Sequence, residues 1–119
     1  MTEFSNKYDL EERIAKLGEN AIILCKRLKI NAITAPIINQ LVRSSTSIGA
    51  NYMEANGVSS RRDFANKISI CRKETQETKH WFRMLAECFP AEKEEIKKLW
   101  SETQELTLIF SKIFSSLRK

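Results

Sequence analysis

Apolar residues recur at alternating steps of four and three in four long stretches of the chain, and this spacing constrains the fold more than any other feature. The first stretch is Leu10, Ile14, Leu17, Ala21, Leu24 and Leu28. Steps that average 3.5 residues place one apolar face along a helix that packs against other helices. Only three glycines and two prolines occur in 119 residues, so we expect a few long helices in one domain over residues 1–119.

Capping residues indicate where the first two helices begin and end. The first is expected from Asp9, with Glu12 completing a capping box, to about residues 30–31. The second is expected to begin at Thr34, whose hydroxyl can cap a first turn that also contains proline. It should run to about residue 56, and we expect Gly57 to close it as a C-terminal cap in the left-handed conformation.

Two further helices complete the predicted fold. Ser60, with Asp63 three residues later, forms a second capping box and starts the third helix. The proline at position 90 ends this helix. The fourth helix is expected over residues 91–117. Four apolar rows joined by short connections predict an all-α, antiparallel up-down-up-down four-helix bundle. The rows of the last three helices are Ile37 or Ile38, Leu41, Ser45, Ile48, Tyr52 and Ala55; Phe64, Ile68, Cys71, Thr75, Thr78, Phe82 and Leu85; and Ile96, Leu99, Thr103, Leu106, Phe110, Ile113 and Leu117.

The third helix carries a second row of residues, about 100° from the first around the helix axis. One row can face the core of its own chain. A second row needs a second partner, which we expect to be another copy of the chain in a homo-oligomer. This second row, assigned to the oligomer interface, is Ile70, Glu74, Glu77, Trp81, Met84 and Cys88.

Residues 36–59 contain only two charged side chains, Arg43 and Glu54, in a chain of which 29% is charged. Small hydroxyl side chains at positions 44–47 form helix poorly in water, so we expect protein to cover this helix on more than one side. Isolated charges in such a helix predict structural ion pairs, either across helices or with an arginine of an adjacent chain. Arg43, Glu54 and Asn51, a candidate register-fixing polar residue, are therefore added to the predicted interface.

No apolar run approaches the roughly 20 residues of a membrane helix, and the first residues lack the apolar core of a signal peptide. We therefore expect a cytoplasmic protein without membrane contact. The three cysteines, Cys25, Cys71 and Cys88, are odd in number and widely spaced. This pattern predicts buried free thiols rather than a disulfide framework.

The sequence predicts no catalytic or metal site. Glu74-x-x-Glu77 followed by His80 resembles part of a di-iron motif, but His80 drifts toward solvent. The first and fourth helices place no carboxylate on their core rows. The serines at 44–47 have no nearby histidine, and no glycine-rich phosphate loop exists. We therefore predict no cofactor, no metal and no enzymatic activity.

Basic residues are concentrated in the third helix. The chain has a net charge of +5, and residues 60–89 hold seven basic against four acidic residues. Four of these bases fall within about 40° of one another around the helix, and such a stripe can neutralise nucleic-acid phosphates. The alternative is an ordinary solvated face. Few aromatic residues interleave with the stripe, so base stacking is not indicated. The predicted nucleic-acid-binding residues are Arg61, Arg72, Lys79 and Arg83 in the stripe and Arg62 and Lys73 beside it.

Uncommon polar residues recur in a distinctive order in the second and third helices. They are Gln40-Leu41-x-Arg43-Ser44-x-x-Ser47-Ile48-x-Ala50-Asn51-Tyr52-x-Glu54-Ala55, Ser60-x-x-Asp63-Phe64 and Lys67-Ile68-x-Ile70-x-x-Lys73-Glu74-x-x-Glu77-Thr78-x-x-Trp81-Phe82-x-x-Leu85. In this order the chain resembles the four-helix-bundle proteins encoded in intervening sequences of bacterial 23S ribosomal RNA genes. Many members carry Asn-Ile-Ala-Glu-Gly where this chain has Tyr52-Met53, which indicates a subgroup.

The resemblance implies a bundle that assembles as a ring, typically a homopentamer. It also implies similarity in fold to the accessory protein of diversity-generating retroelements, which binds nucleic acid and a reverse transcriptase through a basic surface. These properties are expectations that come from the resemblance alone.

Two functions of different classes follow. The first is a non-enzymatic, oligomeric bundle that binds RNA or DNA through the third helix, with copies of itself and a reverse transcriptase as candidate partners. The alternative is a protein–protein scaffold whose positive charge aids solubility or docks an acidic partner. An enzyme would need a metal or cofactor site, and the sequence offers none.

Overall fold

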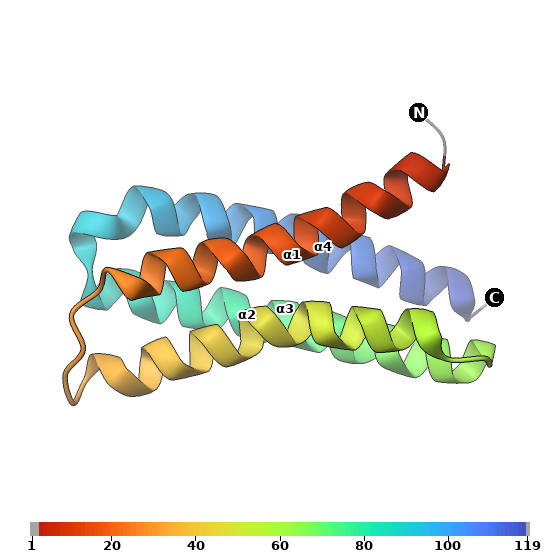
Figure 1. Cartoon of the computed structure of the whole chain (residues 1–119), viewed down its shortest axis with the longest axis horizontal. Coiled ribbons are helices and arrows are strands. Elements are labelled where there is room, and N and C mark those ends of the chain that lie inside the picture. Colours follow the sequence, from red (N-terminus) through yellow and green to blue (C-terminus); the bar gives the residue numbers. More distant parts are fainter. Residues whose placement is uncertain (1–2, 119) are drawn as a thin grey trace.

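Four long helices run along the molecule in alternating directions. The structure is a computed structural model that describes the backbone of residues 3–118 and the side chains of residues 10–118. The helices are α1 (Glu3–Lys26), α2 (Thr34–Gly57), α3 (Arg61–Cys88) and α4 (Lys93–Leu117), with a 3-10 turn at Pro90–Glu92 before α4. Both ends of the chain lie at one end of the molecule, as Figure 1 shows. The predicted all-α, antiparallel four-helix bundle is confirmed.

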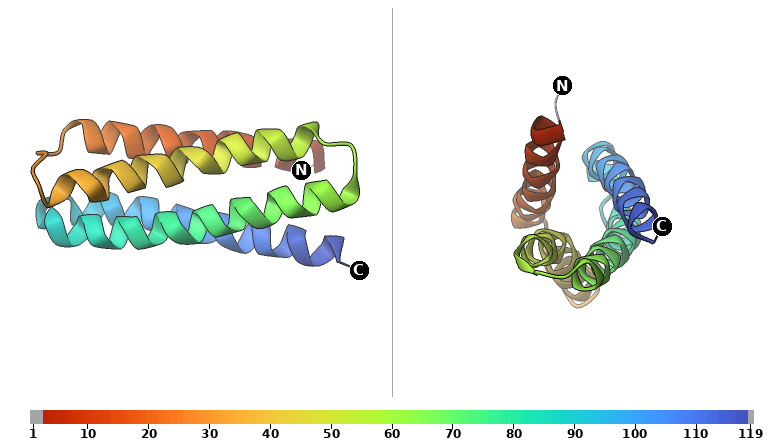
Figure 2. Two further views of the ribbon diagram at one scale, coloured as in Figure 1. Left: turned by 90° about the horizontal axis from the view of Figure 1, so that it is seen from below. Right: turned by 90° about the vertical axis from the view of Figure 1, so that its right-hand side faces the viewer.

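The helices pack mainly on their sequence neighbours. Contacts are most extensive between α2 and α3 and between α3 and α4, and they are weakest between α1 and α4. Viewed along the helices in Figure 2, the four helices form an open arc with α1 and α4 at its two ends. α3 therefore has packed neighbours on two sides, α2 and α4, and a third side that faces outward.

The predicted apolar rows form the core. Every residue of the first row is buried, from Leu10 at 9% exposed to Leu24 at 0%. On α3 and α4 the rows are buried over most of their length and become half-buried near the ends, at Phe64 and Ile113. Thr75, Thr78 and Thr103 are fully buried within these rows, and each hydroxyl donates to a backbone carbonyl three or four residues earlier in its own helix.

α2 is covered on two sides, as its low charge predicts, and both neighbours belong to the same chain. Toward α3, the buried hydroxyl oxygens of Thr78 and Ser44 lie within hydrogen-bonding distance of each other, at 3.0 Å. Toward α1, two glycines allow a close approach. A Cβ on Gly18 would lie 3.4 Å from the Ser45 carbonyl oxygen, and one on Gly49 would lie 3.4 Å from Ile14.

The helix boundaries correct three predictions. α1 begins at Glu3 rather than Asp9, whose side chain lies outside the described ones, and it ends at Lys26 instead of residues 30–31. Thr34 is the first residue of α2 instead of its cap. The Asn31 side chain takes the capping role, because its Oδ1 accepts from the backbone N–H of residue 33 at 2.9 Å and of Thr34 at 3.0 Å.

Gly57 corrects a further prediction. The described backbone has no positive φ angle, so Gly57 does not adopt the left-handed conformation. Instead, α2 ends where Val58 turns extended while its N–H still bonds to the Ala55 carbonyl. The predicted cap of α3 is confirmed, because the Ser60 hydroxyl accepts from the Asp63 N–H at 3.0 Å.

Candidate nucleic-acid interface

The charges of α3 divide between its two packed sides. The acidic residues Glu74 and Glu77 point toward α2, where Arg43 pairs with both of them. One guanidinium nitrogen lies 3.4 Å from a Glu74 oxygen and the other hydrogen-bonds to Glu77. Glu77 also accepts from the Trp81 indole N–H at 3.3 Å. The acidic charge in the middle of α3 is therefore matched by α2.

Both isolated charges of α2 form the structural ion pairs that the sequence predicts, and their partners lie on α3 of the same chain. Besides Arg43, Glu54 accepts from the Lys67 ammonium at 2.6 Å. Asn51 is half-buried and donates to the Ser47 carbonyl of its own helix at 2.9 Å. Since this bond is local, Asn51 does not fix the register between helices within the chain. The assignment of Arg43, Asn51 and Glu54 to an oligomer interface stays a prediction.

Three of the predicted phosphate-binding residues face α4 and contact it. Arg61 donates to the carbonyl oxygens of residues 116 and 117 at the end of α4, at 3.4 and 3.3 Å. The Arg72 guanidinium lies 4.8 Å from the centre of the Phe114 ring. Lys79 donates to the Gln104 side chain at 2.6 Å. These cations hold α3 and α4 together, so replacing them would perturb packing as well as charge.

The other three predicted residues, Arg62, Lys73 and Arg83, are exposed on α3. Within residues 10–118, no salt bridge involves any of the six basic residues. The remaining acidic residues of α3, Asp63 and Glu87, lie in its first and last turns. The structure therefore gathers six cations without ion-pair partners on the outward and α4-facing sides of one helix.

Aromatic residues of α4 interleave with these cations, which the pattern along α3 did not predict. The Trp100 ring lies 5.7 Å from the Lys79 ammonium, and the centre of the Phe114 ring lies 4.8 Å from the Arg72 guanidinium and 5.8 Å from that of Arg118. Trp100 lies off the core row of α4, and that position was the feature of the sequence that indicated an aromatic ring outside the core. The rings come from the next helix, so the spacing of aromatic residues along α3 alone could not indicate them.

The second row of α3 is less exposed than its spacing suggests. Trp81 packs partly against the core of the same chain, Met84 and Cys88 are half-buried, and Ile70 is 38% exposed. α2 covers part of this row through Arg43. This row therefore needs less cover from a second subunit than its spacing suggests, and its assignment to an oligomer interface stays a prediction.

The side chains that could form a metal site or act as a nucleophile do not come together in the described structure. His80 is exposed and its ring meets Trp81 edge-on at 4.8 Å, while Glu74 and Glu77 bind Arg43. Among the described residues, no three metal-ligating side chains converge. Burial raises the pKa of Cys25 to about 11 and, as the main cause, that of Cys71 to about 12, so neither thiol is a ready nucleophile at neutral pH.

Comparisons with known proteins agree with this fold. A family model described as 23S rRNA-intervening sequence protein matches residues 7–112. Among solved structures, the chain is similar to a protein of unknown function of the S23 ribosomal protein family from Bacteroides thetaiotaomicron. The two sequences are 28% identical, and the match covers 88% of this chain and 97% of the other with a TM-score of 0.78. Among curated proteins, none matches. In the described part of the chain, no helix has the length and apolarity needed to cross a membrane.

Proposed function

The chain belongs to the family of 23S rRNA-intervening sequence proteins, and from the charges around its third helix we propose that it is a non-enzymatic accessory protein that binds RNA or DNA. The observation that supports this most is the segregation of charge on α3. Its central carboxylates are matched by Arg43 of α2, whereas its six predicted phosphate-binding cations have no ion-pair partner within residues 10–118. Cations whose charge is not neutralised by a carboxylate are available to phosphate oxygens, which dominate nucleic-acid affinity.

The test uses the three exposed cations of α3, for which the described residues show no salt bridge, side-chain hydrogen bond or cation–π contact with α4. A variant in which each becomes glutamine removes charge and leaves the contacts of Arg61, Arg72 and Lys79 in place. The matched control removes the same charge from exposed lysines on or just after α1, which does not pack on α3. The test variant changes Arg62, Lys73 and Arg83, and the control variant changes Lys16, Lys26 and Lys29.

Affinity is measured by fluorescence polarisation with a labelled RNA hairpin at several salt concentrations. We expect the test variant to bind more weakly and to show a smaller salt slope, by about 0.7 to 0.9 for each phosphate that the protein no longer neutralises. The control variant should bind nearly as the unchanged protein does. Equal weakening in both variants would show that only net charge matters and would refute a site on α3.

Absence of binding even at low salt would refute nucleic-acid recognition altogether. That result would favour the alternative function, a protein–protein scaffold whose basic surface docks an acidic partner. The absence of enzymatic activity and the reverse transcriptase as a partner stay predictions that this experiment does not address.

We also propose that copies of the chain associate through the second row of α3, as a ring of five according to the family resemblance. Ile70 is 38% exposed and Met84 is half-buried on this face. Met84→Lys should dissociate the assembly, and Met53→Lys, on an exposed position of α2, is the matched control. Trp81→Ala is less suitable because Trp81 supports the core. Light scattering that finds a single subunit for the unchanged protein at high concentration would refute association.

A further inference from the structure

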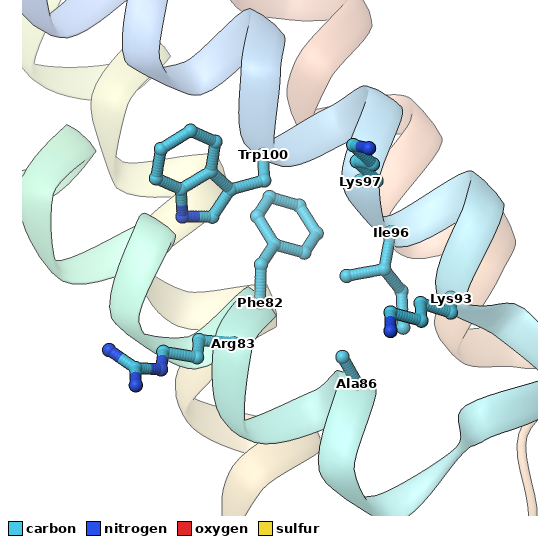
Figure 3. A pocket seen from close by; sticks show the side chains of 7 residues that line it. All are labelled: Phe82, Arg83, Ala86, Lys93, Ile96, Lys97 and Trp100. Atoms are coloured by element: carbon cyan, nitrogen blue, oxygen red, sulfur yellow. The ribbon is translucent and has the colours of Figure 1, made fainter.

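An apolar cleft lies between α3 and α4, near the connection that joins them. It has a volume of about 280 Å³. As Figure 3 shows, the side chains of Phe82 and Ala86 from α3 meet that of Ile96 from α4 in its floor, and Trp100 of α4 lies at one end. Trp100 is 38% exposed, so part of its indole is open to solvent.

Three cations surround this apolar floor. Arg83 extends from α3 on one edge, while Lys93 and Lys97 extend from α4 on the other (Figure 3). Lys93 and Lys97 are one helical turn apart and therefore lie on the same side of α4. Within residues 10–118, no carboxylate forms a salt bridge with any of the three.

We propose that this cleft binds one unpaired nucleobase of a single-stranded nucleic acid, which rests on the nucleic-acid binding proposed above. The base stacks on Trp100. Arg83, Lys93 and Lys97 hold the neighbouring phosphates. A flat aromatic ring suits an apolar floor beside an exposed indole, because every base has a face that can stack. The three cations complement the phosphates on either side of that base. The preferred ligand is therefore a single strand.

The size and lining of the cleft set its selectivity. Its volume is slightly below the range of ligand pockets, about 300–1,000 Å³, so it admits one ring system rather than a duplex. Its lining offers apolar side chains and cationic heads but no carbonyl, amide or carboxylate side chain to read a base edge. We therefore expect weak sequence preference and a strong dependence on the presence of a base.

The experiment compares three oligonucleotides of equal length: oligothymidylate, an abasic strand with the same phosphates, and a duplex. Affinity is measured by polarisation on the full chain. Trp100 fluorescence is followed in a Trp81→Phe background, because Trp81 and Trp100 are the two tryptophans. We expect oligothymidylate to bind about tenfold more tightly than the abasic strand, the gain from stacking one base on an aromatic side chain, and to quench Trp100.

Two variants test the cleft. Trp100→Ala should lower the affinity for oligothymidylate to that for the abasic strand and leave the abasic affinity unchanged. Ala86→Leu fills the floor of the cleft and keeps Trp100, and it should have the same effect. This second variant tests the cleft even if Trp100→Ala fails to fold. Circular dichroism establishes that each variant remains helical.

The outcomes separate this inference from the proposed function. Equal affinity for the base-bearing and abasic strands, with no quenching of Trp100, would overturn the stacking site while nucleic-acid binding stands. Equal binding of duplex and oligothymidylate would overturn it as well. If none of the three oligonucleotides binds at low salt, the stacking site is overturned, and the RNA hairpin of the first test decides whether nucleic-acid binding stands. If the hairpin also fails to bind, both proposals fall, and an acidic peptide with one bulky apolar side chain becomes the better occupant.

Discussion

Removal of the Arg43 guanidinium should destabilise the subunit itself, because it leaves carboxylates at the α2–α3 contact without their partner. The Glu74 side chain is only 15% exposed and the Glu77 side chain 33%, whereas Arg43 is 45% exposed. One Glu74 oxygen, Oε1, is already buried and has no hydrogen-bond partner among the described residues. Arg43→Met would also remove the ion-pair partner of the second Glu74 oxygen, Oε2.

The expected magnitude lies between two limits. An exposed ion pair contributes about 0.2–1 kcal/mol, and breaking a fully buried pair costs about 3–5 kcal/mol. Glu74 lies close to the buried limit and Arg43 close to the exposed one, so we expect Arg43→Met to lower the free energy of unfolding by about 2 kcal/mol. A domain of this length has a total stability of about 6–18 kcal/mol, so the variant should still fold.

The assay is urea unfolding followed by circular dichroism, arranged as a double-mutant cycle. Arg43→Met combined with Glu74→Met should be more stable than the sum of the single changes predicts, because the second change removes the stranded charge. Lys67→Met is the matched control, since it breaks another α2–α3 pair whose carboxylate, that of Glu54, is more exposed, at 59%. We expect the control to lose about 0.5 kcal/mol.

Two results would refute the reasoning. If Arg43→Met costs no more than Lys67→Met, the burial of Glu74 does not govern the energy of the pair. If Arg43→Met leaves unfolding unchanged but dissociates an oligomer on dilution, Arg43 acts between subunits, which is one of the two possibilities that the sequence left open.

Four further predictions concern the bundle. The Arg13 side chain forms two hydrogen bonds to Glu102, at 2.7 and 2.8 Å, that join the weakly packed α1 and α4. We therefore expect Arg13→Met to lower the stability by about 1 kcal/mol and to speed amide exchange in α1. Unchanged amide exchange would contradict this role. Ser60→Ala removes the cap of α3 and should lower stability by about 1 kcal/mol in thermal unfolding, and a change near zero would show that the cap is dispensable. Burial raises the pKa of Cys71 to about 12, so a thiol reagent at pH 8 should modify the half-buried Cys88 first, and earlier modification of Cys71 would contradict the packing. Because the unfolded chain releases the Cys71 proton near pH 8.5, the part of the stability that this thiol contributes should fall as pH rises from about 8.5 toward 12, and Cys71→Ala should remove that part of the pH dependence.

The helices and their core were predictable because their signals are local. The row from Leu10 to Leu28 is buried as its spacing predicts, and Ser60 caps α3 as its sequence predicts. The helix ends that were predicted wrongly depend on weaker sequence signals. Asn31 rather than Thr34 supplies the cap of α2, because either side chain can do so and the path of the loop decides between them. Gly57 permits the left-handed conformation but does not require it.

The candidate site was predictable only in part. Rotation along α3 places Arg72, Lys79 and Arg83 on one side of the helix, and the structure keeps them together there. The sequence did not indicate that this side faces α4, that Arg72 and Lys79 contact it, or that Trp100 stands beside Arg83. It also left open whether Arg43 pairs within the chain or between chains.

The sequence by itself determined which residues share a face of each helix, because a rise and rotation fixed by backbone hydrogen bonds set that pattern. Only the tertiary structure decided which neighbour each face meets, because that depends on the order in which four similar helices pack around a common core. The acidic face of α3 meets Arg43 of α2, and its basic face meets the aromatic residues of α4. Contacts between separate helices have no local signal in the chain, and the proposed base-binding cleft exists only because α3 and α4 pack side by side.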